Sequence, residues 1–195
     1  MALFRLTSPA DNFPIIRADG LILRAPQMSD YDAWAELRAA SRAFLEPWEP
    51  LWPSDDLTRP AFRRRIRRYA EEIHTDSAYP MFVLRQKDEA LLGGLTLGLV
   101  RRGVAQACTL GYWMGERHAG RGTMTAAVKV ASRFAFQDLG LRRIEAACLP
   151  TNNASIRLLE KAGFIREGYA RRYLCIAGAW QDHVLYARLK DDPGV

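Results

Sequence analysis

The sequence has few cysteines and no long hydrophobic run, and each absence excludes a class of protein. Cys108, Cys148 and Cys175 are the three cysteines among 195 residues, and they lack the paired spacing of a zinc site or a disulfide framework. They are predicted to be reduced thiols in the core of a cytoplasmic protein. The apolar runs are short and interrupted by glycine or charge, so neither a membrane span nor a membrane partner is expected. The N-terminal stretch MALFRLTSPADNF also lacks the continuous apolar run of a secretion signal.

Histidine is scarce as well, and internal repeats and low-complexity tracts are missing. His74, His118 and His183 have none of the spacings that bind metals, so no metal site is expected. What is present is the composition of an ordinary globular domain, with 49% hydrophobic and 26% charged residues. The formal net charge of +6 suits a polyanionic ligand or an acidic partner without demonstrating either.

Residue patterns predict one α+β domain with a mixed, mostly antiparallel sheet of about seven strands flanked by four helices. Residues 1–17 are expected to be an irregular arm, 18–190 the domain and 191–195 a tail. Alternating or short apolar runs predict the strands at 21–26, 81–85, 91–100, 104–114, 142–149, 169–176 and 181–189. Helical spacing of apolar residues predicts the helices at 29–44, 62–73, 122–139 and 152–162.

The stretch between strand 104–114 and helix 122–139 has the features of a phosphate-binding loop. The free N–H groups and the dipole of a helix N-terminus favour an anion, and glycines let a phosphate approach the backbone. A nucleotide P-loop needs Lys and Ser or Thr after its second glycine, but Arg121 and Gly122 follow Gly120 here. A dinucleotide fingerprint needs a third glycine where Thr125 stands. Both familiar loops are therefore excluded, and Arg117-x-x-Gly120-x-Gly122 remains.

That remaining pattern resembles the acetyl-CoA pyrophosphate loop of the GNAT N-acetyltransferases, whose motif is Arg/Gln-x-x-Gly-x-Gly/Ala. The expected order of elements over residues 18–190 is also similar to this fold. The resemblance implies acetyl-CoA as a substrate and a gap between the fourth and fifth strands. It implies that the backbones of Tyr112, Trp113 and Met114 contact the pantetheine arm, with their side chains in the core. The loop residues that it assigns to the pyrophosphate are Arg117, His118, Ala119, Gly120, Arg121, Gly122 and Thr123.

A second segment, NNASIRLLEKAGF at 152–164, is similar to the Asn-containing motif of the same family. Asn152 matches the residue that contacts the pantetheine arm, and Ser155 matches the small residue one turn later. The family's usual tyrosine, which reprotonates the CoA thiolate, falls at Leu159. Ser155 is therefore the expected catalytic residue, donating a hydrogen bond to the leaving thiolate. Both Asn152 and Ser155 could instead serve as helix caps, and the two roles are compatible.

The loop FLEPWEP at 44–50 and the tail at 166–187 resemble the RimJ/RimL branch of the family, and within it the RimJ type. The resemblance implies direct acetyl transfer to the N-terminal alanine of a small-subunit ribosomal protein. Two alternatives stay open: a small-molecule amine or another N-terminus as the acceptor, and a CoA-binding, ribosome-associated factor without activity. An acidic pocket would favour polycationic small amines.

No general base is evident. An α-amino group has a pKa of about 7.7–8.0 and is partly neutral at physiological pH, so little is demanded of a base. The weak candidates, acting through water, are Glu46, Glu49, Glu116 and Asp182. Backbone N–H groups near Trp113 and Met114 are expected to stabilise the oxyanion.

Two further features have two interpretations each. Trp48 and Trp52 could line the acceptor groove or anchor their proline-rich loop on the core. The arginines between Arg63 and Arg68 form one face of a helix, which is expected to be solvated, with a weak contact to ribosomal RNA as the alternative. The sequence predicts no particular oligomeric state.

Overall fold

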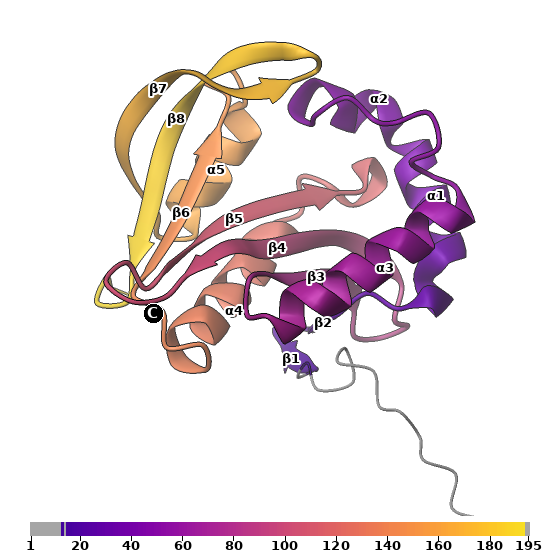
Figure 1. Cartoon of the computed structure of the whole chain (residues 1–195), viewed down its shortest axis with the longest axis horizontal. Coiled ribbons are helices and arrows are strands. Elements are labelled where there is room, and N and C mark those ends of the chain that lie inside the picture. The colour runs from indigo at the N-terminus through magenta and orange to yellow at the C-terminus, as the bar shows by residue number, and fades with distance from the viewer. Residues whose placement is uncertain (1–12, 14, 194–195) are drawn as a thin grey trace, which may run out of the picture.

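The computed structural model of the chain describes residues 13 and 15–193, and one eight-stranded sheet runs through it (Figure 1). The strand order is β1-β2-β3-β4-β5-β6-β8-β7, and only β5 and β6 are parallel neighbours. The predicted α+β class with a mixed, mostly antiparallel sheet is confirmed. The strands are β1 Ile16–Ala18, β2 Leu21–Arg24, β3 Tyr79–Arg85, β4 Leu91–Arg101, β5 Ala107–Met114, β6 Arg143–Cys148, β7 Ile165–Ile176 and β8 Ala179–Leu189.

Helices cover both faces of this sheet. Apolar residues of α4 and α5 pack into the larger core cluster on one face, whereas those of α1 and α3 pack into a second cluster on the other face. The helices are α1 Tyr31–Ala40, α2 Arg42–Leu45, α3 Arg59–His74, α4 Thr123–Gln137 and α5 Asn153–Lys161. The helix expected at 29–44 is thus two helices, separated at Ser41, whose hydroxyl accepts a hydrogen bond from the N–H of Glu116. No helix in the described part of the chain is long and apolar enough to cross a membrane.

Two further expectations from the sequence need correction. The irregular arm was expected to reach residue 17, but Ile16 and Arg17 pair with β2 in the short strand β1. The turn that joins these strands is Asp19-Gly20, both with positive φ, and Asp-Gly is a strong hairpin signal. Residues 1–12 and 14 of the arm lie outside the described residues. Cys175 was expected in the core but is exposed, because β7 is an edge strand.

The sheet opens between β5 and β6, which confirms the predicted gap between the fourth and fifth expected strands. The two strands pair only from Ala107 to Leu110 and then separate (Figure 1). Beyond that point β5 stays with β4, and a Cβ on Gly93 would lie 2.4 Å from the carbonyl oxygen of Trp113. Glycine at this position lets β4 hold β5 closely, while β6 continues alongside β8.

Candidate functional site

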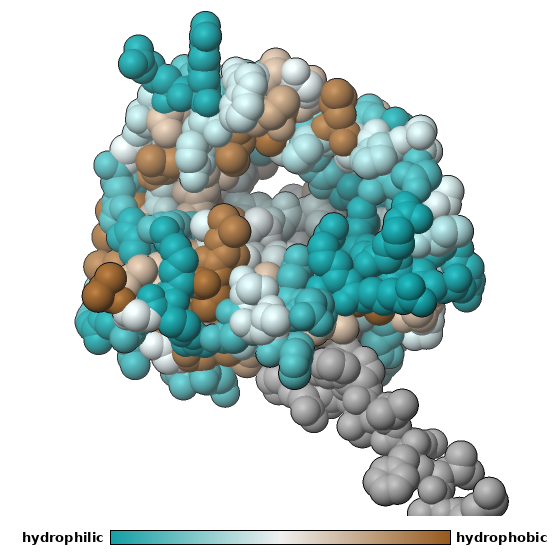
Figure 2. All heavy atoms as spheres, viewed as in Figure 1, coloured by the Kyte–Doolittle hydropathy of each residue, from teal (hydrophilic) through white to brown (hydrophobic). Residues whose placement is uncertain are grey.

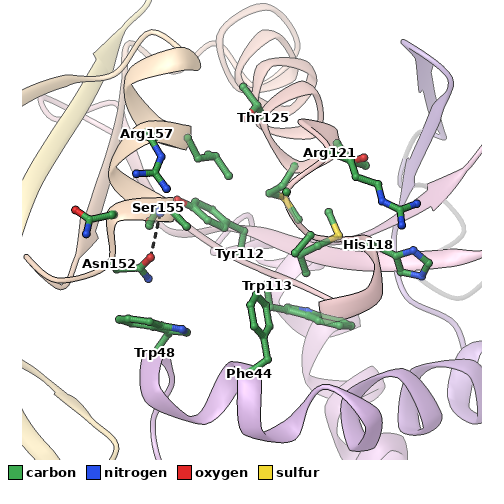
Figure 3. Close-up of a pocket in the computed structure, with 18 of the residues that line it drawn as sticks. Phe44, Trp48, Tyr112, Trp113, His118, Arg121, Thr125, Asn152, Ser155 and Arg157 are labelled. Carbon is green, nitrogen blue, oxygen red and sulfur yellow. Dashed lines mark hydrogen bonds between the residues drawn. The ribbon is translucent and has the colours of Figure 1, made fainter.

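A cavity of about 620 Å³ occupies the opening between β5 and β6. It is lined by β5, by the loop and first turn of α4, by the first turns of α5, and by α2 with the loop that follows it (Figure 3). Of the residues that the resemblance assigns to catalysis or to acetyl-CoA binding, only Arg117 is not among those that line it. The predicted residues that meet there are Tyr112, Trp113, Met114, His118, Ala119, Gly120, Arg121, Gly122, Thr123, Asn152 and Ser155.

The loop before α4 leaves backbone N–H groups available to a ligand. Gly120 and Gly122 have φ values of +75° and +77°, which is the left-handed conformation that other residues rarely adopt. Gly122 is the N-cap of α4 and offers no side chain to bind the first N–H groups of the helix. These donors and the positive end of a 15-residue helix therefore face the cavity.

Positive side chains line the same cavity, from the loop before α4 and from α5. Arg121, Arg157 and Lys161 line the cavity, and none of them has an acidic partner within the described ranges. His118 accepts a hydrogen bond at Nε2 from Nε of Arg117, 3.2 Å away. Burial, followed by the charge of Arg117, lowers the pKa of His118 below its ordinary value. The arrangement suits a ligand that carries several negative charges.

The N-terminus of α5 supplies the polar groups across the gap. The Asn152 Oδ1 atom accepts a hydrogen bond from the Ser155 N–H at 3.0 Å, so the predicted capping of this helix is confirmed. The Ser155 hydroxyl is 2.6 Å from the Tyr112 hydroxyl. Leu159, which stands at the family's usual tyrosine position, is buried in the core and offers no polar group.

Sequence reasoning missed the side chain of Tyr112. It was expected to contribute only its backbone, but its ring packs against the core and its hydroxyl reaches the cavity (Figure 3). Burial raises the pKa of this phenol well above its ordinary value, and the bond to Ser155 lowers it by a smaller amount. The partner lies 43 positions later in the chain, so no local pattern pointed to the contact.

A second missed feature closes the opposite side of the cavity. The Arg38 guanidinium makes two hydrogen bonds of 2.7 Å to the Glu49 carboxylate and lies 4.0 Å over the Trp52 ring. The Trp52 Nε1–H donates to Glu49 as well, at 2.8 Å. The backbone carbonyl of Glu49 in turn accepts from the N–H of Ala177, in the turn between β7 and β8. We call this connection, residues 46–53 joined to 177–178, the strap.

The strap joins two parts of the molecule that are far apart in the sequence (Figure 1). Leu51 lies against Gly178, where an added Cβ would be 3.1 Å from Leu51 Cδ1. The space-filling view shows the surface hollowed beneath this connection (Figure 2). Trp48 lines the cavity, but Trp52 does not, because it stacks on Arg38. Trp52 therefore anchors this loop, whereas a contact of Trp48 with the acceptor stays a prediction.

The four candidate bases have different environments. Glu49 is the only carboxylate among the lining residues, and its oxygens accept hydrogen bonds from Arg38 and Trp52. Glu46 is paired with Arg42 on the surface. Asp182 accepts from the backbone N–H of Arg172 and from the Tyr169 hydroxyl, and these bonds lower its pKa. Glu116 does not line the cavity. No free carboxylate therefore faces the cavity from the described residues.

The arginine-rich face lies on α3 and does not line the cavity. Arg64, Arg65 and Arg68 pair with Asp55, Asp56 and Glu72, which neutralises much of this charge. A contact of this face with ribosomal RNA stays a prediction. Among the residues that the structure describes, no cluster of side chains could hold a metal ion.

Comparison with known proteins agrees with this geometry. Residues 20–165 match the model of the acetyltransferase (GNAT) domain, so the chain belongs to the GNAT family of acetyltransferases. Its relatives place it in the RimJ/RimL branch, as an N-acetyltransferase. The [ribosomal protein uS5]-alanine N-acetyltransferase of Escherichia coli is 35% identical over 185 residues, covering 93% of this chain and 94% of its own. The probable N-acetyltransferase YjcK of Bacillus subtilis is 34% identical over 178 residues, covering 91% and 98%.

Solved structures show the same similarity in three dimensions. Ribosomal-protein-S5-alanine acetyltransferase from Vibrio fischeri superposes with a TM-score of 0.85 at 29% identity, covering 92% of this chain and 98% of that one. RimJ of Mycobacterium smegmatis in complex with CoA-disulfide has a TM-score of 0.84 at 31% identity, covering 91% and 86%.

Proposed function

We propose that this N-acetyltransferase transfers the acetyl group of acetyl-CoA to an N-terminal alanine of a small-subunit ribosomal protein, in the cytoplasm. The observation that carries the proposal is the two-sided cavity. One side has a glycine loop, a helix N-terminus and unpaired cations, and the other is closed by the strap and has no free carboxylate. The names of two similar proteins supply the acceptor.

The first side fits acetyl-CoA, which supplies an activated acetyl thioester. The N–H groups after Gly122 and the side chain of Arg121 would hold the pyrophosphate. Arg157 and Lys161 are further cations for a polyanionic ligand at the same mouth. The backbone of β5 beyond Leu110 has no partner on β6, so it can bind an extended pantetheine arm as an added strand would.

The reaction is a direct transfer. The neutral amine attacks the thioester carbonyl carbon, the C–S bond breaks, and its electron pair leaves on sulfur while the amine gives one proton to water. A backbone N–H near Trp113 and Met114 stabilises the charge that develops on the carbonyl oxygen. The Ser155 hydroxyl donates a hydrogen bond to the departing sulfur, which is the role that Leu159 cannot fill. A water-mediated proton loss suffices because an α-amino group is partly neutral already.

The acceptor side favours an uncharged or weakly charged chain end. A polyamine or a polycationic antibiotic needs carboxylates to bind it, and the Glu49 carboxylate is already neutralised by Arg38. The strap bridges the hollow between the loop after α2 and the β7–β8 turn, so the acceptor would enter the cavity through a passage beneath it. A flexible N-terminus enters such a passage more easily than a lysine on a folded surface.

The test uses isotope-labelled acetyl-CoA, small ribosomal subunits that lack acetylation, and intact-mass analysis of every ribosomal protein. We expect one labelled protein, with the label on its N-terminal alanine. A synthetic peptide of the same N-terminus should be acetylated, whereas the same peptide with a blocked α-amino group and a free lysine should not. Label on lysine, or on spermidine but on no peptide, would overturn the acceptor. Binding of CoA with no transfer to any amine would favour the regulatory factor.

A further inference from the structure

The hydroxyl groups of Tyr112 and Ser155 meet across the opening of the sheet. Tyr112 projects from β5 and Ser155 from the first turn of α5, and both side chains line the cavity (Figure 3). We propose that Tyr112 is a positioning residue that directs the Ser155 hydroxyl proton toward the CoA sulfur. The inference rests on the proposed use of acetyl-CoA and is independent of the acceptor.

We assign the phenol as the donor in this 2.6 Å hydrogen bond, in which the distance alone allows either hydroxyl to donate. Burial raises the pKa of Tyr112, so its oxygen keeps its single proton at any working pH. Within the described part of the chain Ser155 is its only hydrogen-bond partner. A buried O–H without an acceptor is costly, and donating to Ser155 gives the phenol proton a partner within the protein.

The donation determines what the serine can do. A serine hydroxyl has one proton and two lone pairs, so accepting from Tyr112 leaves its own proton free to point elsewhere. A serine within a helix can donate back to the carbonyl four residues earlier, but no such bond forms with Thr151 among the described residues. The backbone N–H of Ser155 is already held by Asn152. The hydroxyl proton is therefore available to a group in the cavity.

Cys148 is the other sulfur near this hydroxyl. Burial raises the pKa of its thiol, and Ser155 lowers it by a smaller amount. A protonated thiol is a weak acceptor. A thiolate that leaves a thioester in the cavity is charged, so it accepts a hydrogen bond far more strongly than a thiol does. The Ser155 hydroxyl therefore donates its hydrogen bond to this thiolate and not to Cys148. Neither hydroxyl gives up its proton in this step. The thiolate is stabilised by a hydrogen bond and takes its proton later from water.

The measurable consequence is a lowered pKa of the bound CoA thiol, because a hydrogen bond to the charged form favours it. The absorbance of the thiolate near 240 nm reports this ionisation for CoA bound to the protein, with no acceptor present. We expect Tyr112→Phe and Ser155→Ala each to raise the pKa of bound CoA by about one unit, a tenfold change in ionisation. Because the hydroxyls act in series, the double variant should resemble either single variant.

Turnover provides the second readout. Each single variant should lower kcat by about tenfold and leave KM for acetyl-CoA within about twofold, since the hydrogen bond strengthens only as the sulfur becomes charged. The remaining titratable or charged side chains of the cavity are unchanged in all variants and cannot account for a difference between them. They are Glu49, His118, Arg121, Arg157 and Lys161.

Tyr186→Phe is the matched control. The Tyr186 hydroxyl also binds α5, because it donates to Glu160 in the last turn of that helix at 3.1 Å. Tyr186 does not line the cavity. If Tyr112 only steadied the helix, both variants would shift the thiol pKa equally, and the proposal would fail. It would fail equally if Tyr112→Phe left the pKa unchanged, or if the effects of Tyr112→Phe and Ser155→Ala added in the double variant. The two proposals can fail separately. If the thiol pKa shifts as expected but no ribosomal protein is acetylated, this inference is supported and only the proposed acceptor is overturned.

Discussion

The two sides of the cavity are built in different ways. The side that we propose for acetyl-CoA is lined mainly by two short segments, 118–125 at the start of α4 and 151–161 along α5. The side that we propose for the acceptor is held in place by single residues from three elements: Arg38 on α1, Glu49 after α2, and Ala177 in the turn before β8. The first side depends on local backbone geometry, and the second on tertiary contacts between distant residues. The two sides should therefore respond differently to mutation.

The largest effect is expected at the strap. Arg38→Met removes the cation from a largely buried ion pair and leaves the Glu49 carboxylate with the Trp52 N–H but without a counter-charge. Breaking such a pair costs about 3–5 kcal/mol of folding free energy. With the loop released, KM for the acceptor should rise while the affinity for CoA changes little. Denaturant unfolding and calorimetric CoA binding measure the two quantities.

Arg38→Met with Glu49→Leu is the control for this prediction. It removes both charges, so much of the lost stability should return. Equal stability of the single and double variants would show that the uncompensated carboxylate is not the cause. Loss of CoA affinity in the single variant, in protein that is still folded, would contradict the separation of the two sides.

The next effect is expected in the phosphate-binding loop. Gly122→Val forces a β-branched residue into a φ of +77° and places a side chain where a pyrophosphate must approach the backbone. We expect CoA affinity to fall by at least about 100-fold, or about 2.7 kcal/mol. Gly140→Val is matched, since Gly140 has a φ of +68° beyond the other end of α4 and does not line the cavity. Similar losses of CoA affinity in both variants would assign the effect to helix strain.

The same contrast explains what could be predicted from the sequence. Gly120, Gly122 and Asn152 were placed correctly because glycine at a strand–helix junction and Asn before a helix have a local physical meaning. The gap in the sheet followed from the resemblance to the family and not from any pattern in β5 or β6. Glu49 was predicted as a possible base. Its neighbours in the sequence do not reveal that Arg38 binds its carboxylate.

The hydroxyl of Tyr112 could not be predicted for the same reason. In a strand that alternates between two faces, an aromatic residue is most simply assigned to the core. Its partner on α5 comes into reach only because β5 and β6 separate after Leu110. Contacts between side chains across the gap, such as that of Tyr112 with Ser155, are found only from the structure. The glycine loop beside them is found from the sequence.

The smallest effect concerns His118 and the pH dependence of CoA binding. Its pKa lies below the ordinary 6.5 because of burial and then Arg117, Arg85 and Arg121, so the free protein holds it neutral. A polyphosphate beside it favours the charged form, so binding raises this pKa and takes up a proton. Affinity for CoA should therefore increase as the pH falls from 7.5 toward 5.5, by up to about fivefold, since a shift of one unit corresponds to a factor of ten at most. Calorimetry in buffers of different ionisation enthalpy counts the protons taken up.

The phosphate groups of CoA titrate in the same range, but they do so equally with His118→Gln, so the difference between the two proteins isolates the histidine. An identical pH slope in both would show that His118 stays neutral beside the ligand and contributes a hydrogen bond at most.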